Sequence, residues 1–197
     1  MVKSIYHIIL IEKSLASLNT PLCDFGWQAK DFNLLGVDGK YWNLSEINGA
    51  NGLLIMFICN HCPYVKAILP RLVNDLDGLK KMGINTVAIS SNDVVNYPQD
   101  SYENMQKISE EQKFSFPYLF DESQKVAKLY KAICTPDFFG FNAKLKLQYR
   151  GRFDSSGRGE PPANNQRDLY LGMQMIAKTQ QGPKEQFSSI GCSIKWK

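Results

Sequence analysis

One short stretch limits most strongly what this chain can fold into. Residues Leu53–Ile58 are apolar without interruption, and Cys59 and Cys62 follow directly. A run of this length and composition predicts a central β-strand that is covered on both faces. Apolar residues then recur every three or four positions from Val65 to Leu79, which predicts an amphipathic helix. The two cysteines are therefore expected in the turn that leads from a buried strand into a helix.

The spacing of these two cysteines favours thiol chemistry. At the start of a helix they can close a small disulfide ring, and the unpaired backbone N–H groups and the positive helix end favour a thiolate. We expect Cys59, at the exposed end of the turn, to be the nucleophile, and Cys62 to lie one helical turn deeper. In this scheme the Cys59 thiolate attacks a disulfide, and Cys62 resolves the mixed disulfide to leave a Cys59–Cys62 bond. A hydrogen bond or positive charge from His61 is expected to lower the pKa of Cys59.

Composition argues against several other classes of protein. The 197 residues include 44% hydrophobic and 21% charged residues, as in an ordinary soluble protein, and a net charge of +4 does not by itself indicate nucleic-acid binding. Five cysteines are too few and too irregularly placed for a disulfide scaffold. His7 and His61 are the only histidines, which argues against a closed structural zinc site. We expect no metal and no cofactor.

The amino terminus carries an incomplete export signal. Residues 5–11 are mostly apolar and are followed by the small residues Ser14 and Ala16, but Glu12 and Lys13 interrupt the pattern. No run reaches the length of a membrane span. The expected location is cytoplasmic, and export is the alternative.

The order of the remaining patterns predicts an α/β domain between two extensions. Residues 1–28 are expected to form an N-terminal extension, 29–182 the domain, and 183–197 a polar C-terminal tail that carries Cys192. The domain is expected to contain, in chain order, a β-hairpin (31–44), the strand and helix described above, a parallel strand (84–90), a helix (101–113), a short strand (117–120), a helix from Ser123, a second hairpin (137–149) and a closing helix (167–178).

Four separated motifs support a family resemblance. They are Phe57–Val65, Thr135–Phe139, Tyr149–Asp154 and Ile190–Lys197. In this order they resemble the bacterial peroxiredoxin-like branch of the AhpC/TSA (redoxin) family of thioredoxin-like proteins, over about residues 27–197. The resemblance implies a thioredoxin-like fold in which helices flank a central mixed β-sheet, and it also places the attacking cysteine at Cys59.

The resemblance further implies which residues surround the dithiol. The Thr135–Pro136 peptide bond is expected to be cis and to pack against the two cysteines, with Thr135 offering backbone groups to an extended substrate. The residues expected to shape the site are Asn60, His61, Pro63, Thr135 and Pro136. Cys192 is a candidate third redox thiol, or a third metal ligand with Cys59 and Cys62, because Ile194 and Trp196 could dock the tail on the domain.

Three functions fit these residues. The first is a thiol–disulfide oxidoreductase that acts on protein or small-molecule disulfides and has a thiol reductant or reductase as partner. The second is a thiol peroxidase, although the peroxiredoxin signature Pro-x-x-x-Thr-x-x-Cys fits neither cysteine: Cys59 takes the threonine position relative to Cys62, and Met56 takes it relative to Cys59. The third is a copper-binding module, because soft thiolates prefer Cu(I).

Overall fold

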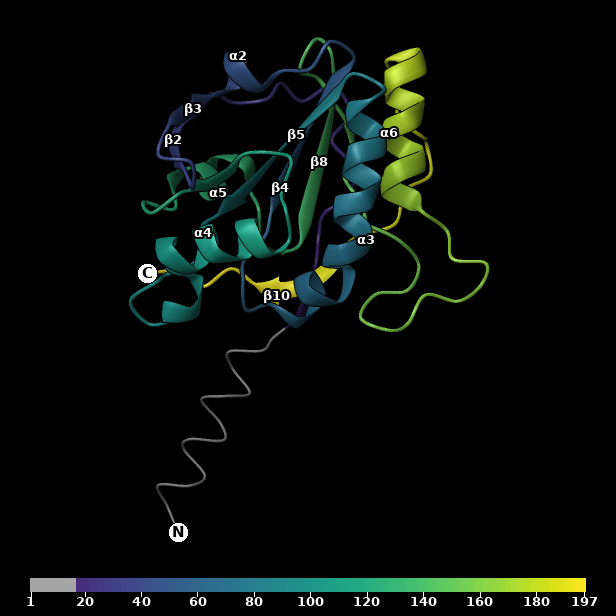
Figure 1. The fold of residues 1–197 in the computed structure, drawn as a ribbon. Coiled ribbons are helices and arrows are strands. Elements are labelled where there is room, and N and C mark those ends of the chain that lie inside the picture. Colours follow the sequence, from purple (N-terminus) through teal and green to yellow (C-terminus); the bar gives the residue numbers. More distant parts are fainter. Residues whose placement is uncertain (1–16) are drawn as a thin grey trace.

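The computed structural model describes residues 17–197, which form two β-sheets and the helices around them (Figure 1). The larger sheet has seven strands in the order β3-β2-β6-β5-β4-β8-β9. Its strands are β2 (Asn33–Gly36), β3 (Tyr41–Asn43), β4 (Gly52–Phe57), β5 (Ile84–Ser90), β6 (Tyr118–Phe120), β8 (Asp137–Asn142) and β9 (Leu147–Tyr149). The β4–β5 and β5–β6 pairs are parallel, and the other pairs are antiparallel. This mixed sheet confirms the predicted fold class.

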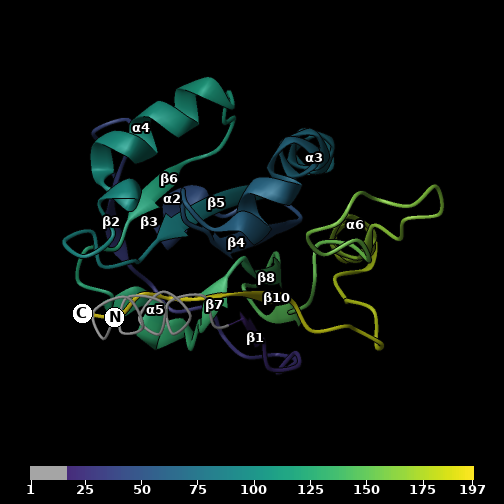
Figure 2. The ribbon, with the colours of Figure 1, turned by 90° about the horizontal axis from the view of Figure 1, so that it is seen from below.

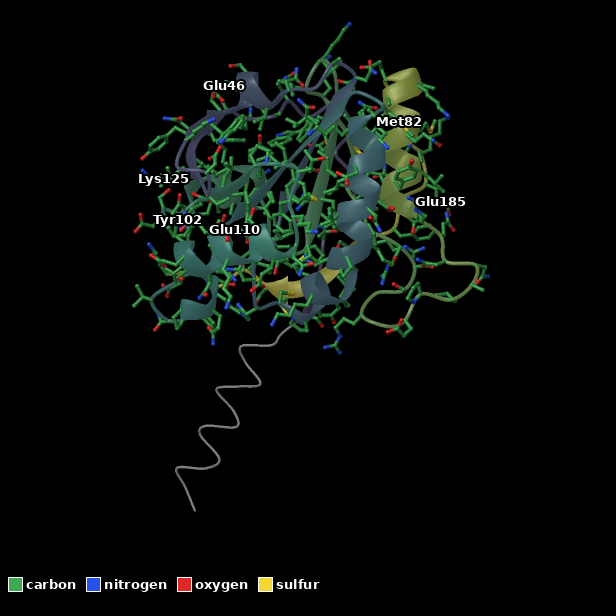
Figure 3. The ribbon with its side chains drawn as sticks, in the orientation of Figure 1. Glu46, Met82, Tyr102, Glu110, Lys125 and Glu185 are labelled. Carbon is green, nitrogen blue, oxygen red and sulfur yellow. The ribbon has the colours of Figure 1, made fainter. Side chains whose placement is uncertain are left out.

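Helices cover both faces of the larger sheet. They are α2 (Leu44–Ile47), α3 (Pro63–Lys80), α4 (Tyr102–Glu111), α5 (Lys125–Tyr130) and α6 (Asp168–Thr179), with one 3-10 turn, η1 (Pro98–Asp100). Figure 2 shows α5 on the opposite side of the sheet from α3 and α4. Buried residues of α3, α4 and α6 pack in one apolar cluster, and those of α2 and α5 pack in the other. Side chains fill the space between these helices and the sheet (Figure 3). The hydroxyl of Tyr102 on α4 donates to the carbonyl of Gly36 at 2.6 Å.

Strand β4 is the centre of the sheet because its side chains face both clusters. Leu54 and Met56 belong to the α3 side, whereas Leu53, Ile55 and Phe57 belong to the α5 side. All six residues of β4 are buried, as expected for a strand that lies between β5 and β8 and under helices on both faces. The sequence-based prediction for this strand is confirmed.

Helix α3 begins at the site-bearing loop and continues along the sheet. Cys62 is its N-cap residue, and Pro63 takes the first helical position, where a missing N–H breaks no hydrogen bond. The buried face of α3 is made of residues at helical spacing: Val65, Ile68, Leu69, Leu72, Leu76 and Leu79. These apolar contacts fix the start of the helix against the end of β4.

A second, three-stranded antiparallel sheet lies beside this helix start. Its strands are β1 (Ser17–Asn19), β10 (Ile190–Ser193) and β7 (Cys134–Thr135), with β10 in the middle. Figure 1 shows β10 at the end of α3 where the helix begins, and Figure 2 shows β1, β7 and β10 together. The predicted polar tail therefore contains a strand, in which Gly191 and Cys192 are buried. The sequence did not predict this strand, because it depends on pairing with the distant strand β7.

The boundaries predicted for the extension and the tail stay predictions, and the predicted export signal lies outside the described residues. Within residues 17–197, none of the helices combines the length and apolar character that crossing a bilayer would require.

Candidate active site

The Cys59–Cys62 loop joins the end of β4 to the start of α3. Both thiols are enclosed: Cys59 is 2% exposed and Cys62 is 0% exposed. The expectation that Cys59 lies at an exposed end of the turn is wrong, because β7 and β10 pack over the loop. All five cysteines, which lie in the described part of the chain, are free thiols in this structure.

Thr135 contacts both thiols through two different groups. Its hydroxyl oxygen lies 3.3 Å from Sγ of Cys59, and its carbonyl oxygen accepts a hydrogen bond from Sγ of Cys62 at 3.1 Å. The Thr135–Pro136 bond is cis, as the resemblance implied. The second half of the predicted site therefore lies where the sequence placed it.

Cys192 reaches the same cluster from the opposite end of the chain. Strand β10 pairs Cys192 with Thr135, and directly paired residues in an antiparallel sheet project from the same face. Cys192 is 3% exposed and belongs to the same buried cluster as Cys59 and Cys62. Its thiol and that of Cys62 lie near enough to shift each other's pKa. The tail therefore docks on the domain and brings a third thiol to the pair.

The surroundings of Cys62 lower the pKa of its thiol. The neighbouring thiols of Cys192 and Cys59 contribute most, and Thr135 and the backbone of Val65 contribute less. Together they outweigh burial, which acts in the opposite direction. Position at the N-terminus of a helix also favours an anion.

The pKa values of the two neighbouring thiols, those of Cys59 and Cys192, are raised. Burial raises the pKa of Cys59 well above its usual range, and the hydrogen bond to Cys62 and the charge of Asp100 raise it further. The pKa of Cys192 is raised by its hydrogen bond to Cys62 and by burial. The sequence-based prediction that Cys59 is the attacking thiol stays a prediction, and these pKa shifts point to Cys62 as a second candidate.

Asp100, which the sequence reasoning missed, fixes the two residues between the cysteines. Its buried carboxylate accepts the backbone N–H groups of Asn60 and His61 at 2.8 and 3.1 Å. It also accepts from Nδ1 of His61 at 2.6 Å and from the side-chain amide of Asn92 at 2.8 Å. Asp100 stands 40 positions after Asn60 on the turn η1, and the sequence carries no motif that links the two.

His61 and Asn60 are held in place by these and other contacts. The ring of His61 stacks on Tyr97 at 5.7 Å between centroids and pairs with Asp100. The side-chain oxygen of Asn60 accepts from the hydroxyl of Tyr118 at 3.0 Å, and its amide donates to the carbonyl of Gln99 at 3.1 Å. The predicted effect of His61 on the pKa of Cys59 stays a prediction.

One group of side chains has the composition of a metal site. Within residues 17–197, the group of three ligand atoms that lie within 4.8 Å of one another comes from Cys59, His61 and Asp100. Oδ1 of Asp100 already accepts the backbone N–H groups of Asn60 and His61. Its Oδ2 accepts from the ring nitrogen of His61 and from the side-chain amide of Asn92. A metal bound by all three residues would have to break this network, so the donor set fits a metal poorly.

The remaining two cysteines lie outside the cluster. Burial raises the pKa of Cys23 to about 12 and raises that of Cys134 well above its usual range. Thiols of this kind react slowly because the thiolate is the nucleophile. The site therefore contains three of the five cysteines.

A pocket lies next to the cluster. It has a volume of about 210 Å³. Its walls come from the start of α3, the cis-proline, the loop after β9, and the strands β1 and β10. The lining residues are Tyr64, Ile68, Pro136, Arg152, Phe153, Asp154, Ser155, Gly157, Asn19, Ser188, Ser189 and Ile190. Pro136, which follows Thr135 through the cis peptide bond, forms part of its wall.

Comparison with known proteins agrees with this geometry. The AhpC/TSA family matches residues 25–150. No curated protein matches the chain. The crystal structure of a conserved protein from Geobacillus kaustophilus has 41% sequence identity and a TM-score of 0.88, and the match covers 93% of this chain and 97% of that one.

Two further structures extend the comparison. A hypothetical protein from Sinorhizobium meliloti 1021 has 34% identity and a TM-score of 0.84, with coverage of 92% of this chain and 99% of that one. A peroxidoxin from Mycobacterium tuberculosis has 15% identity and a TM-score of 0.58, with coverage of 79% and 97%, a likeness that concerns the fold alone. The family match and the close structural relatives agree with the resemblance first noted from four motifs, and the chain belongs to the AhpC/TSA family of thioredoxin-like redox proteins.

Proposed function

We propose that this protein is a thiol–disulfide oxidoreductase that uses Cys59 and Cys62 as its dithiol/disulfide couple. The observation that carries the proposal is the contact of both thiols with Thr135, beside the cis-proline, at the start of a helix. A helix start lowers the pKa of a thiol, and a second thiol three residues away can close the exchange as an intramolecular disulfide.

In the proposed reaction the first attack comes from Cys62, because it caps the start of helix α3 and its surroundings lower the pKa of its thiol. Its sulfur attacks one sulfur of a substrate disulfide, a mixed disulfide forms, and the other substrate sulfur leaves as a thiolate. Cys59 then loses its proton and attacks Sγ of Cys62, so that a Cys59–Cys62 disulfide forms and the second substrate thiol leaves. The substrate disulfide is reduced by two electrons, the dithiol is oxidised by two, and an external thiol reductant returns the protein to its starting state.

The proposed substrates are disulfides of proteins or small molecules. The pocket of about 210 Å³ beside Pro136 accommodates a small disulfide or one side chain of a larger substrate. We propose a cytoplasmic location, where thiol reductants are available.

The order of attack is tested by trapping. We expect the variant with both Cys59→Ser and Cys192→Ser to accumulate a mixed disulfide at Cys62 with glutathione disulfide, because no clustered thiol is left to displace the glutathione. We expect Cys62→Ser to lose disulfide exchange at least about 100-fold. Mass spectrometry of the trapped species is the measurement, and Cys134→Ser is the matched control because its thiol is also buried beside β10. A mixed disulfide at Cys59 instead would reverse the order, and no exchange by the unmodified protein would overturn the function.

A thiol peroxidase is the second candidate, and the position of Cys62 favours it. A thiolate at a helix start, next to Pro63, can attack a hydroperoxide to give a sulfenic acid that Cys59 resolves. The threonine of the peroxiredoxin signature is replaced by Cys59, so the expected peroxide consumption with a thiol reductant is slow. Peroxide turnover that exceeds disulfide turnover would make this the main activity.

A further inference from the structure

Cys62 lies between two thiols, and the proposed function uses only one of them. Cys59, Cys62 and Cys192 are all buried, and each of the two outer thiols lies near enough to Cys62 to shift its pKa. The three residues belong to one buried cluster, and Cys192 is the Cα partner of Thr135, whose carbonyl oxygen accepts from Cys62. The third thiol is therefore placed on the same sulfur that the exchange reaction attacks.

The chain holds Cys192 at this place from both sides. Before it, Ser189 exchanges hydrogen bonds with Thr20, and its hydroxyl donates to the carbonyl of Pro136 at 2.9 Å. After it, the backbone N–H of Ile194 donates to the carbonyl of Ile133, and the N–H of Lys195 donates to Asn92. A thiol that only filled space in a mobile tail would not need anchors on each side.

Close approach of backbone to backbone brings the strand to the site. A Cβ atom on Gly191 would collide with the carbonyl oxygen of Thr135, so a residue with a side chain does not fit there without a shift of β10. Gly191 precedes Cys192 directly, and it allows the strand to lie against the Thr135–Pro136 segment. The sequence thus provides for contact between β10 and the dithiol.

We propose that Cys192 is a second resolving thiol, which competes with Cys59 for a mixed disulfide on Cys62. This inference rests on the proposed exchange function. Cys192 loses its proton and attacks Sγ of Cys62, the bond between Cys62 and the substrate sulfur breaks, and the substrate thiol leaves with that proton. The product is a Cys62–Cys192 disulfide, at the same oxidation level as the Cys59–Cys62 disulfide.

The two products differ in what they leave free. A Cys59–Cys62 disulfide leaves β10 attached through hydrogen bonds alone. A Cys62–Cys192 disulfide links β10 covalently to the start of α3 and leaves the Cys59 thiol reduced. Attack of Cys59 on Cys62 converts the second product into the first without gain or loss of electrons.

The test uses glutathione disulfide as the oxidant and counts released glutathione. Every variant carries Cys23→Ser and Cys134→Ser, so that only the three clustered thiols react. With Cys59→Ser added, we expect two molecules of glutathione for each protein molecule and a Cys62–Cys192 disulfide in the peptide map. With both Cys59→Ser and Cys192→Ser, we expect one molecule of glutathione and a stable mixed disulfide on Cys62.

The outcomes separate the inference from the function on which it rests. If the Cys59→Ser variant stops at the mixed disulfide while the protein with all three thiols closes a Cys59–Cys62 disulfide, Cys192 does not resolve and the function stands. If the protein with all three thiols releases no glutathione, the proposed function fails. Should the variants not fold, peptide maps of the unmodified protein decide, taken from samples quenched with acid at successive short times after glutathione disulfide is added. The inference requires a Cys62–Cys192 disulfide at the early times, and its absence at every time would overturn the inference.

Discussion

At the scale of the residue, the site depends on how the protein surrounds one sulfur atom with donors. Two neighbouring thiols, Thr135 and the backbone of Val65 lower the pKa of Cys62, which lies at the start of a helix. Charge-assisted hydrogen bonds of this kind stabilise an anion even where burial disfavours it. The same charge is a source of stability for the fold, which gives the first prediction.

Because the folded state lowers the pKa of Cys62 from an ordinary value near 9, the fold gains stability as pH rises toward that value and loses it as pH falls. We expect the difference in unfolding free energy between the reduced protein and Cys62→Ser to grow between pH 5 and 8, by up to about 1.4 kcal/mol per pH unit. Urea unfolding at several pH values measures it. The difference for Cys134→Ser should stay constant, since burial keeps that thiol neutral in this range.

Asp100 is a positioning residue that acts on the cysteines through the loop between them. We expect Asp100→Asn to lower the unfolding free energy by about 1–3 kcal/mol, because an amide cannot accept all four hydrogen bonds that the carboxylate accepts. Loss of its negative charge should also lower the pKa of Cys59 and make the couple more oxidising. Unfolding curves and redox titration against glutathione measure the two effects.

The neighbouring carboxylate provides the control for this variant. Asp93 accepts hydrogen bonds from Val95 and Asn96 and touches neither cysteine, so Asp93→Asn should change stability without moving the reduction potential. Equal potentials for the Asp100→Asn variant and the unmodified protein would show that Asp100 supports the fold only.

The residues that the sequence predicted are those whose spacing carries information. Cys59 and Cys62 are close in the chain, and Thr135 with Pro136 follows from a motif. Asp100 could not be predicted, because an aspartate in a loop beside a proline resembles any helix-start residue until the fold brings it to the dithiol. The charge on Cys62 could not be predicted either, since it depends on a thiol 130 positions away.

At the scale of the element, strand β10 determines access to the thiols. It lies between β1 and β7 and against the start of α3. Replacing Gly191 by alanine would place a Cβ atom against the carbonyl oxygen of Thr135 and displace the strand. The site should then open while the larger sheet remains folded.

We therefore expect Gly191→Ala to increase the rate at which iodoacetamide alkylates Cys62 in the folded, reduced protein by about tenfold, and to lower the unfolding free energy by about 1–3 kcal/mol. Alkylation followed by mass spectrometry measures the rate. Gly159→Ala is the control, because its Cβ would meet only the carbonyl of Ser156, at 3.3 Å. An unchanged rate for Gly191→Ala would mean that β10 does not limit access.

The elements that the sequence predicted well are those with a long or regular pattern. Strands β4 and β5 and helix α3 have apolar runs or helical spacing that follow from local composition. Strands β1 and β10 have three and four residues and no alternation, so nothing local distinguishes them from loops. They form because β10 pairs with β1 on one side and with β7 on the other. Strands β1 and β10 come from opposite ends of the described chain, so no local pattern encodes their pairing.

At the scale of the whole molecule, segments from both ends of the described chain meet at the dithiol. Ser17 pairs with Cys192, and Cys192 pairs with Thr135, so the small sheet joins three distant regions. The larger sheet supplies the rigid support through β4, whereas the small sheet supplies the cover. Stability and access thus belong to different parts of one fold.

The enclosure of the thiols has a consequence for which molecules react with them. Because paired backbone encloses both thiols, we expect a small hydroperoxide or a compact disulfide to react with them faster than the disulfide of a folded protein, which can reach them only after β10 is displaced. The size of a reaction partner should then limit its reaction before its reduction potential does. A large oxidant would leave the thiols reduced even where its reduction potential favours their oxidation.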